Sequence, residues 1–312
     1  MFEIGGYIEL DHYRGEMLHK DGILLNCGRS CLKYLIKARG IKKIYLPYFC
    51  CDSVIEACQQ ENLEINYFHI DENFIPKDIE LNSDEWLYIV DYYGQLDRST
   101  IENLYQKYER IIIDEAQNYF AEPVEGIDTL YTCRKFFGVA DGAILYTNVK
   151  LNEDLPIDES FKRMNFLLGR FERTASEFYS EYVANNDFFN SEPVKQMSKL
   201  TKNLLHALDY EFICERRTKN FERLHKAFNV VNKLNLKVPK GAFAYPLMIE
   251  NGAELRKILI QEKIYVPKLW PNVTNIEYES KLASDILPLP VDQRYGLDEM
   301  NYLIKEINNI WR

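Results

Sequence analysis

The sequence of 312 residues lacks long basic tracts and long apolar stretches. Asp and Glu outnumber Lys and Arg by 48 to 38, which gives a formal net charge of −10. Non-specific binding of nucleic acid needs clustered positive charge, so we do not expect this function. No apolar stretch reaches the roughly eighteen residues of a membrane-spanning helix. The opening segment, MFEIGGYIELDHYRGE, has early acids and no apolar centre, so no signal peptide is predicted.

Several common cofactor motifs are also absent. The sequence contains neither G-x-G-x-x-G nor G-x-x-x-x-G-K-[ST], and neither H-E-x-x-H nor G-x-S-x-G. The seven cysteines are odd in number and irregularly spaced, and no C-x-x-C pair occurs. We therefore expect no metal site and a reduced, cytoplasmic protein.

The composition is that of a globular protein, with 46% hydrophobic and 28% charged residues. In the first half of the chain, short apolar runs alternate with helical patterns. The runs lack strict alternation of apolar and polar residues, as expected for strands buried on both faces. Predicted strands lie at 23–26, 43–46, 65–70, 86–90, 110–113, 129–132 and 143–147. We predict a three-layer α/β fold with a mostly parallel seven-stranded sheet.

Helices are predicted between these strands at 30–38 and 52–60, and a third, ending at Tyr108, opens with the capping box Ser99-x-x-Glu102. The pattern changes after residue 148, and 153–228 is mostly helical. Beyond it we predict strands at 243–249, 264–266 and 286–289, and helices at 253–262, capped by Asn251, and 298–311. The division is a large α/β domain over 1–200, including the N-terminal segment, and a smaller C-terminal α+β domain over 201–312.

The end of the first strand is a candidate anion site. The segment Asn26-Cys27-Gly28-Arg29-Ser30 leads into a helix, whose free N–H groups favour phosphate. Ser30 adds a hydroxyl and Arg29 a positive charge. A plain helix cap with Gly28 in the turn explains the same residues.

Two further strand ends carry candidate chemistry, because ligands of open α/β sheets bind beyond the carboxyl ends of the strands. Three isoleucines precede Asp114, whose semi-buried carboxylate needs a partner, and Gln117 lies within reach of the same ligand. Lys135 falls in a short apolar loop between two strands. Its amine suits a Schiff base with an aldehyde cofactor. Alternatively, Asp114 caps a helix and Lys135 is a surface residue.

The order of these motifs carries a resemblance. The chain resembles the sugar aminotransferases called DegT/DnrJ/EryC1/StrS, which have fold type I of the pyridoxal 5'-phosphate (PLP) enzymes. The match covers about 23–148 and returns near residues 287–290. The motifs are Asn26-x-Gly28, Leu46-Pro47-Tyr48, Tyr93-Gly94-Gln95, Asp114-Glu115-Ala116-Gln117, Thr132-x-x-Lys135 and Leu287-Pro288-Leu289-Pro290.

The resemblance implies a role for each matching residue on the ring side of PLP. Lys135 matches the lysine that forms the Schiff base with the cofactor. Asp114 matches the acid beside the pyridine nitrogen, and Gln117 matches the glutamine near the ring hydroxyl. Cys51 stands where many relatives place an aromatic side chain on the ring.

The resemblance also implies a phosphate-binding turn. Gly28 and its neighbour Arg29 match that turn, where relatives have a small Thr or Ser in place of Arg29. Thr132 stands where fold type I enzymes often place a phosphate-binding hydroxyl. Asp91 occupies a position where relatives often have His.

The implied function is transfer of an amino group from glutamate to a keto sugar linked to a nucleotide, in surface-polysaccharide or secondary-metabolite sugar biosynthesis. The family also implies a homodimer with sites built from both subunits. Two alternatives stay open. One is a different PLP reaction on the same fold, such as dehydration, decarboxylation or aldol cleavage. The other is a non-catalytic relative that binds a ligand or partner. This alternative stays open because Arg29, Cys51 and Asp91 differ from the residues of the relatives.

Overall fold

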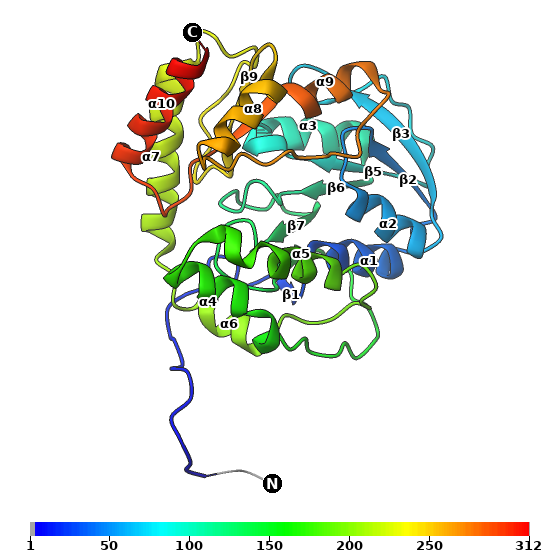
Figure 1. The fold of residues 1–312 in the computed structure, drawn as a ribbon. Helices are drawn as coiled ribbons and strands as arrows, with labels where there is room; N and C mark the ends of the chain where they lie inside the picture. The colour runs from blue at the N-terminus through cyan, green and yellow to red at the C-terminus, as the bar shows by residue number, and fades with distance from the viewer. Residues whose placement is uncertain (1–3, 312) are drawn as a thin grey trace.

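The large sheet of the protein has eight strands in the order β1-β8-β7-β6-β5-β2-β3-β4 (Figure 1). The computed structural model describes residues 4–311. The strands are β1 (Ile23–Leu25), β2 (Lys43–Pro47), β3 (Glu64–Ile70), β4 (Pro76–Lys77), β5 (Glu85–Val90), β6 (Ile111–Asp114), β7 (Asp128–Thr132) and β8 (Ala143–Tyr146).

The centre of this sheet is parallel, as predicted. Strands β3, β2, β5, β6 and β7 pair in parallel, whereas β8, β1 and β4 join antiparallel. All seven predicted strands are present, and β4 is the additional eighth. It has only two residues, begins with Pro76 and pairs at the edge of the sheet, so no apolar run marked it.

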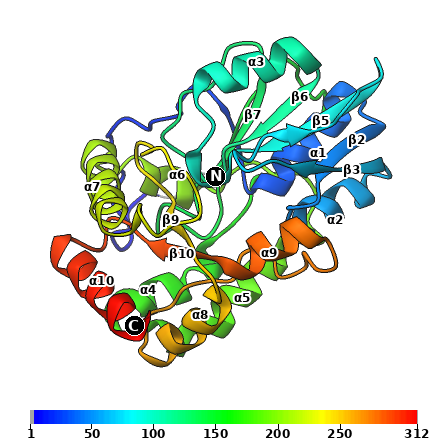
Figure 2. The ribbon, with the colours of Figure 1, turned by 90° about the horizontal axis from the view of Figure 1, so that it is seen from above.

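Helices lie on both sides of the large sheet. Figure 2 shows α3 (Arg98–Tyr108) on one side and α1 (Gly28–Arg39) with α2 (Asp52–Gln60) on the other. The predicted capping box of α3 is wrong. Asp97 is the N-cap residue, because its carboxylate accepts from the Thr100 N–H at 2.9 Å, and the Ser99 hydroxyl donates to that same carboxylate.

The helical middle of the chain follows β8. Its helices are α4 (Asn165–Glu172), α5 (Tyr179–Phe188), α6 (Lys199–Leu205) and α7 (Tyr210–Phe228). Single turns of 3₁₀ helix form at η1 (Tyr92–Gly94), η2 (Phe161–Arg163) and η3 (Ala175–Phe178). The Arg29 side chain donates to the Asn186 carbonyl, so the end of α5 lies near the start of α1.

A second, two-stranded sheet closes the chain. Strands β9 (Ala244–Met248) and β10 (Ile286–Pro290) pair antiparallel, and α7, α8 (Gly252–Gln261) and α10 (Leu297–Trp311) pack with them, while α9 (Glu277–Asp285) leads into β10. The predicted strand at 264–266 is wrong. The Ile264 N–H bonds back to the Leu259 carbonyl at 2.8 Å, so this segment finishes the end of α8 and joins no ladder.

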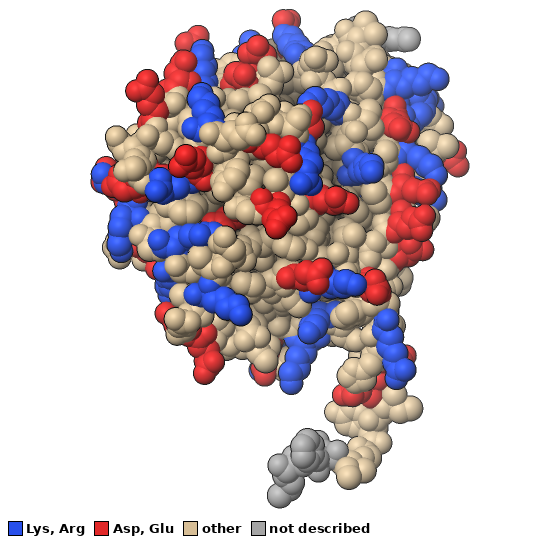
Figure 3. Space-filling model, turned by 180° about the vertical axis from the view of Figure 1, so that it is seen from behind, with Lys and Arg blue, Asp and Glu red and all other residues tan. Residues whose placement is uncertain are grey.

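The main buried core runs from the large sheet into β9 and β10. The division into domains near residue 200 stays a prediction. Within residues 4–311 no helix has the length and apolar character needed to span a membrane, and all seven cysteines are free. Figure 3 shows Lys and Arg interspersed with Asp and Glu over the face it presents, without a continuous basic band.

Candidate active site

Asp114 ends β6 at the carboxyl edge of the parallel strands. It is buried, with 8% of its surface exposed, and both carboxylate oxygens are occupied. The Tyr88 hydroxyl donates to Oδ2 at 2.7 Å, and the Ala116 N–H donates to Oδ1 at 2.8 Å. These two hydrogen bonds fix the direction of the carboxylate.

Lys135 lies in the turn that follows β7, next to β6 in the sheet. The N–H groups of Phe136 and Phe137 both bond to the Cys133 carbonyl, at 3.0 and 2.9 Å. This tight turn buries the two phenylalanines and leaves Lys135 exposed. Its ammonium lies 5.6 Å from the centre of the Phe243 ring, a cation–π contact.

The charges of Lys135 and Asp114 both act on the thiol of Cys51, the residue before α2. The Cys50 thiol, hydrogen-bonded to Cys51, is the largest cause that lowers the pKa of Cys51 from 9.0 to about 6. The Ser53 hydroxyl, 3.0 Å away, and Lys135 act in the same direction, while burial and Asp114 oppose them. The structure therefore brings Lys135, Asp114 and Cys51 to one site; their roles there stay predictions.

The start of α1 has uncapped N–H groups. Cys27, the N-cap residue, is extended and makes no side-chain capping bond. A Cβ added to Gly28 would meet only Leu130, at 3.9 Å, so packing does not require glycine there. The Ser30 hydroxyl donates to Asn26 Oδ1 at 2.6 Å, and its expected role as a phosphate donor stays a prediction.

Arg29 and Thr132 lie at the same edge of the sheet. The buried Nε of Arg29 has no hydrogen-bond partner in the described residues, and its Nη1 donates to the Asn186 carbonyl at 3.3 Å. Thr132 ends β7, where it pairs with Ala143, and its side chain is half-buried. Both positions suit the anion contacts that the resemblance implies.

Gln117 is buried, and its side-chain oxygen accepts from the Tyr93 N–H at 3.0 Å. Tyr93 has a left-handed backbone, with φ of 58°, inside η1. In this structure Gln117 therefore holds an unfavourable turn at the end of β5. A contact of Gln117 with a ring hydroxyl stays a prediction.

Two further acids lie buried behind this site. Burial raises the pKa of Asp91 to about 6, although the Leu96 N–H and the Asn118 amide each donate to it at 2.8 Å. Burial, with the nearby Asp91, also raises the pKa of Glu115 well above its usual value. Of these two acids, Glu115 is the one whose ionisation is disfavoured more strongly.

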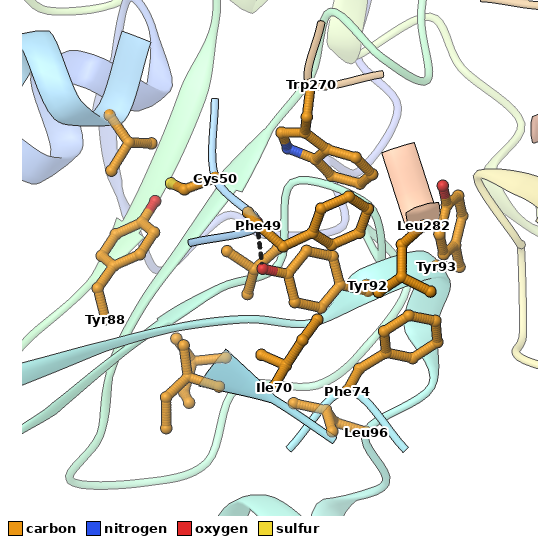
Figure 4. Close-up of a cluster of buried hydrophobic side chains, with 14 of the residues drawn as sticks. Phe49, Cys50, Ile70, Phe74, Tyr88, Tyr92, Tyr93, Leu96, Trp270 and Leu282 are labelled. Atoms are coloured by element: carbon orange, nitrogen blue, oxygen red, sulfur yellow. Dashed lines mark hydrogen bonds between the residues drawn. The ribbon is translucent and has the colours of Figure 1, made fainter. Parts of the chain in front are cut away.

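An aromatic cluster supports the loop that carries Cys50 and Cys51 (Figure 4). The Tyr92 hydroxyl donates to the Phe49 carbonyl, and the Trp270 ring lies 4.2 Å from that of Phe49. Trp270 comes from the C-terminal segment, so residues distant in sequence fix the loop in place.

Other features of the chain lie away from this site. A hollow of about 360 Å³ is lined by Tyr45, Tyr67, His69 and Lys77, among others, at the β3–β4 edge. Strands β6, β5 and β2 lie between that edge and β7. No group of three or more His, Cys, Asp and Glu side chains that could hold a metal ion occurs within residues 4–311.

The sequence analysis missed several contacts of the site. Tyr88 meets Asp114 because β5 and β6 pair in parallel, with Val90 opposite Asp114. Cys50 was counted only among the seven cysteines, and Phe243 only as part of a predicted strand. The alternating side-chain directions of β5 could have suggested Tyr88, once the strand order was known.

The fold is that of the type I PLP transferases. The structure is similar over 92% of this chain to a DegT DnrJ EryC1 StrS aminotransferase from Brucella abortus, with a TM-score of 0.62, 16% identity and 85% of that chain covered. The resemblance found in the sequence is thus confirmed at the level of the fold.

Two other solved structures give the same result. NtdA from Bacillus subtilis, solved with bound cofactor PMP, has a TM-score of 0.66 and 13% identity, covering 92% of this chain and 72% of its own. The PLP form of the putative sugar aminotransferase Spr1654 from Streptococcus pneumoniae has a TM-score of 0.63 and 12% identity, covering 94% and 88%. No family model and no curated protein matches the sequence.

Proposed function

We propose that the protein is a PLP-dependent aminotransferase that moves an amino group from glutamate to a keto sugar linked to a nucleotide. The observation that supports this proposal is the placement of Asp114 at the carboxyl end of β6 and of Lys135 in the turn after β7, where both charges act on Cys51. Adjacent strands of a sheet lie about 5 Å apart, so an amine and a carboxylate at their ends can contact one small ligand.

The residues present fit the cofactor. Gly28 leaves space at the uncapped start of α1, and the buried Nε of Arg29 lacks a partner, which suits a phosphate group. Thr132 and Gln117 lie at neighbouring strand ends. Phe243 offers an aromatic surface near Lys135, and the Cys51 thiol lies within range of the Lys135 charge.

The bound cofactor supplies an electron-withdrawing ring that stabilises negative charge on an attached substrate carbon. Asp114, oriented by Tyr88 and the Ala116 N–H, holds a proton on the ring nitrogen. Lys135 moves a proton at the substrate α-carbon as a general acid and base. The Phe136–Phe137 turn fixes the position from which Lys135 reaches that carbon.

The substrate class rests on analogy with the structural relatives, which are described as sugar aminotransferases. The protein with added PLP is expected to turn yellow, and borohydride is expected to fix the cofactor on Lys135, as mass spectrometry of the digested protein can locate. Glutamate alone should then bleach the colour and release 2-oxoglutarate. A colourless, unlabelled protein would contradict any PLP chemistry. Labelling without a response to glutamate would favour another PLP reaction.

We also propose that the protein acts as a homodimer. Apolar side chains stand exposed on α4, including Phe171 at 92% and Leu168 at 62%, and on the N-terminal segment, including Ile4, Tyr7 and Ile8. Exposed apolar groups of this kind are typical of protein interfaces. Sedimentation equilibrium at micromolar concentration should give twice the mass of 36.9 kDa, and the mass of one chain would contradict the proposal.

A further inference from the structure

A buried arginine of α7 is hydrogen-bonded to the turn that carries Lys135. Arg217 has 1% of its surface exposed, and its Nη2 donates to the Phe136 carbonyl at 3.1 Å. Its guanidinium group also lies 4.7 Å from the centre of the Phe136 ring. Phe136 directly follows Lys135, so Arg217 contacts both the main chain and the side chain of the residue next to the amine.

A second nitrogen of Arg217 holds the segment that the Lys135 ammonium contacts. Nη1 donates to the carbonyl of Ala242, which directly precedes Phe243, at 3.0 Å. The centre of the Phe243 ring lies 5.6 Å from Lys135 Nζ and 6.1 Å from the centre of the Phe136 ring. One planar guanidinium group therefore bridges the Lys135 turn and the aromatic surface beside its amine.

Gln293, which follows β10, completes these contacts. Its side-chain oxygen accepts from Arg217 Nε at 2.8 Å, and its side-chain amide donates to the Phe136 carbonyl at 2.8 Å. The Phe136 carbonyl thus accepts from two donors, one on α7 and one after β10. We call Arg217 and Gln293 the Phe136 clamp.

The charge of Arg217 is costly where it lies. Its acceptors are two main-chain carbonyls and a side-chain amide, all of them uncharged. Burial lowers the pKa of Arg217 to about 10, so the group stays charged at neutral pH. Burying a cation against uncharged acceptors costs free energy. In return, the rigid fork of an arginine reaches all three acceptors at once, which Lys and Gln cannot do.

A purely structural role is the alternative, and the chain contains an arginine of that kind. Arg256, on α8, is also buried and donates to two main-chain carbonyls, those of Ser284 at 3.2 Å and Ile286 at 2.8 Å. These acceptors lie at the end of α9 and the start of β10. The acceptors of Arg217 differ, because they belong to the Lys135 turn and to the segment that its amine contacts.

We propose that Arg217 is a positioning residue for Lys135, assisted by Gln293. The Phe136 clamp fixes the Lys135 turn relative to the segment before β9, and so holds the amine where it reaches a substrate carbon. The inference rests on the proposed function, which assigns the chemistry to Lys135. Precise placement of a reacting group supplies much of the rate of an enzyme, and a residue that only orients that group can therefore be essential.

Hydrogen exchange measured by mass spectrometry tests the clamp without any cofactor. The N–H groups of Phe136 and Phe137 bond to the Cys133 carbonyl, so they should exchange slowly in the wild type. Arg217→Lys keeps the charge but loses the fork, and the peptide that contains this turn should exchange about tenfold faster. The matched control Arg256→Lys should leave the exchange of that peptide unchanged.

Urea denaturation of the two lysine variants completes this comparison. Both variants lose hydrogen bonds to main-chain carbonyls, so both should lose stability. Faster exchange of the turn in Arg217→Lys alone then reports a local loosening and not a weaker fold. Gln293→Leu removes one donor to the Phe136 carbonyl and tests the clamp if Arg217→Lys fails to fold.

The second readout is the reaction of the PLP-loaded protein with glutamate, followed by absorbance. Arg217→Lys should lower the rate constant about 10- to 100-fold, because a misplaced amine reaches the substrate carbon less often. The glutamate concentration for half-saturation should stay within about twofold, since the clamp contacts the Lys135 turn and not the substrate. Arg256→Lys should match the wild type in both quantities.

Two results would overturn the proposal. One is exchange of the Lys135 turn in Arg217→Lys at the rate of the wild type. The other is a rate constant that falls no further in Arg217→Lys than in Arg256→Lys. Failure of the proposed function looks different, because the wild type itself would then form no borohydride-stable adduct at Lys135. The exchange measurement alone would in that case decide whether the clamp holds the turn.

Discussion

The two ends of strand β7 carry charge in different ways. At the amino end, Asp128 is buried and paired within the chain. Arg39 donates to it through Nε at 2.9 Å and Nη2 at 2.7 Å, and the Thr147 hydroxyl donates at 2.7 Å. At the carboxyl end, the turn after β7 places Arg134 within range of the charges of Arg29 and Arg163, and Lys135 against an aromatic ring.

We interpret this difference as one between charge that stabilises the fold and charge that is available to the proposed ligand. A buried ion pair with complete hydrogen bonds is stable without any further partner. Charged groups held near one another without matching acids are instead typical of binding and catalytic sites. Substitutions at the two ends of β7 should therefore affect different properties of the protein.

The largest effect is expected for Lys135→Met. Removing the amine removes the proposed general acid and base, so turnover should fall by about a thousandfold or more, while the fold is retained because the side chain is exposed. Steady-state assays and circular dichroism measure the two properties. Lys150→Met, at another exposed lysine after β8, is the control and should be fully active. Substantial activity in Lys135→Met would place the chemistry elsewhere.

Asp114→Asn should have the next largest effect. The amide keeps the size of the side chain but removes its negative charge, so turnover should fall by about a hundredfold or more. The unfolding midpoint should change little, since the amide oxygen can still accept from the Ala116 N–H. Full activity would remove Asp114 from its proposed role.

Asp128→Asn tests the opposite end of β7. It leaves Arg39 without its carboxylate, and the free energy of unfolding should fall by about 3 kcal/mol. Urea denaturation measures the loss, and the activity of the folded variant should match the wild type. Asp84→Asn is the control, because its exposed pair with Lys43, at 3.6 Å, is screened by solvent and should contribute little to stability. An equal loss of stability in both variants would contradict a larger contribution from the pair of Asp128 and Arg39.

The smallest expected effect is a shift in the titration of Cys51. Its pKa of about 6 predicts that the rate of alkylation by iodoacetamide rises with a midpoint near pH 6. Since the folded pKa lies below the ordinary value of 9.0, the thiolate stabilises the fold fully above pH 9 and this contribution is lost as the pH falls through 6. Cys50→Ala removes the main cause of the shift and should move the midpoint upward. A wild-type midpoint near 9 would contradict the prediction.

The sequence predicted the strands of the large sheet well because they are buried on both faces and read as unbroken apolar runs. It failed at β4, which is too short to form a run, and at 264–266, where apolar residues finish a helix end. The sequence pattern also predicted Ser99 rather than Asp97 as the N-cap residue of α3. Both residue types are good caps, and only the hydrogen-bond geometry of the helix start distinguishes them.

The candidate site was predictable as far as it lies at strand ends. Asp114 and Lys135 follow apolar runs directly, so the sheet rule located them. Tyr88 and Arg217 were not predictable, because they reach the site through strand register and through the packing of α7. The Ser30 hydroxyl can donate either to Asn26 or to a bound anion. The sequence alone does not decide which of the two acceptors it uses.

The position of β1 has a consequence for how the chain folds. Ile23 pairs with Leu145, 122 positions later. Strand β1 therefore cannot join the sheet until β8 is in place. Closing a loop of this length is slow compared with forming the local helices. The start of α1 and the Lys135 turn flank these two strands. On the ribosome the pocket should therefore be assembled late, after β8 has emerged, and a nascent chain cut before that point should be unable to capture the cofactor.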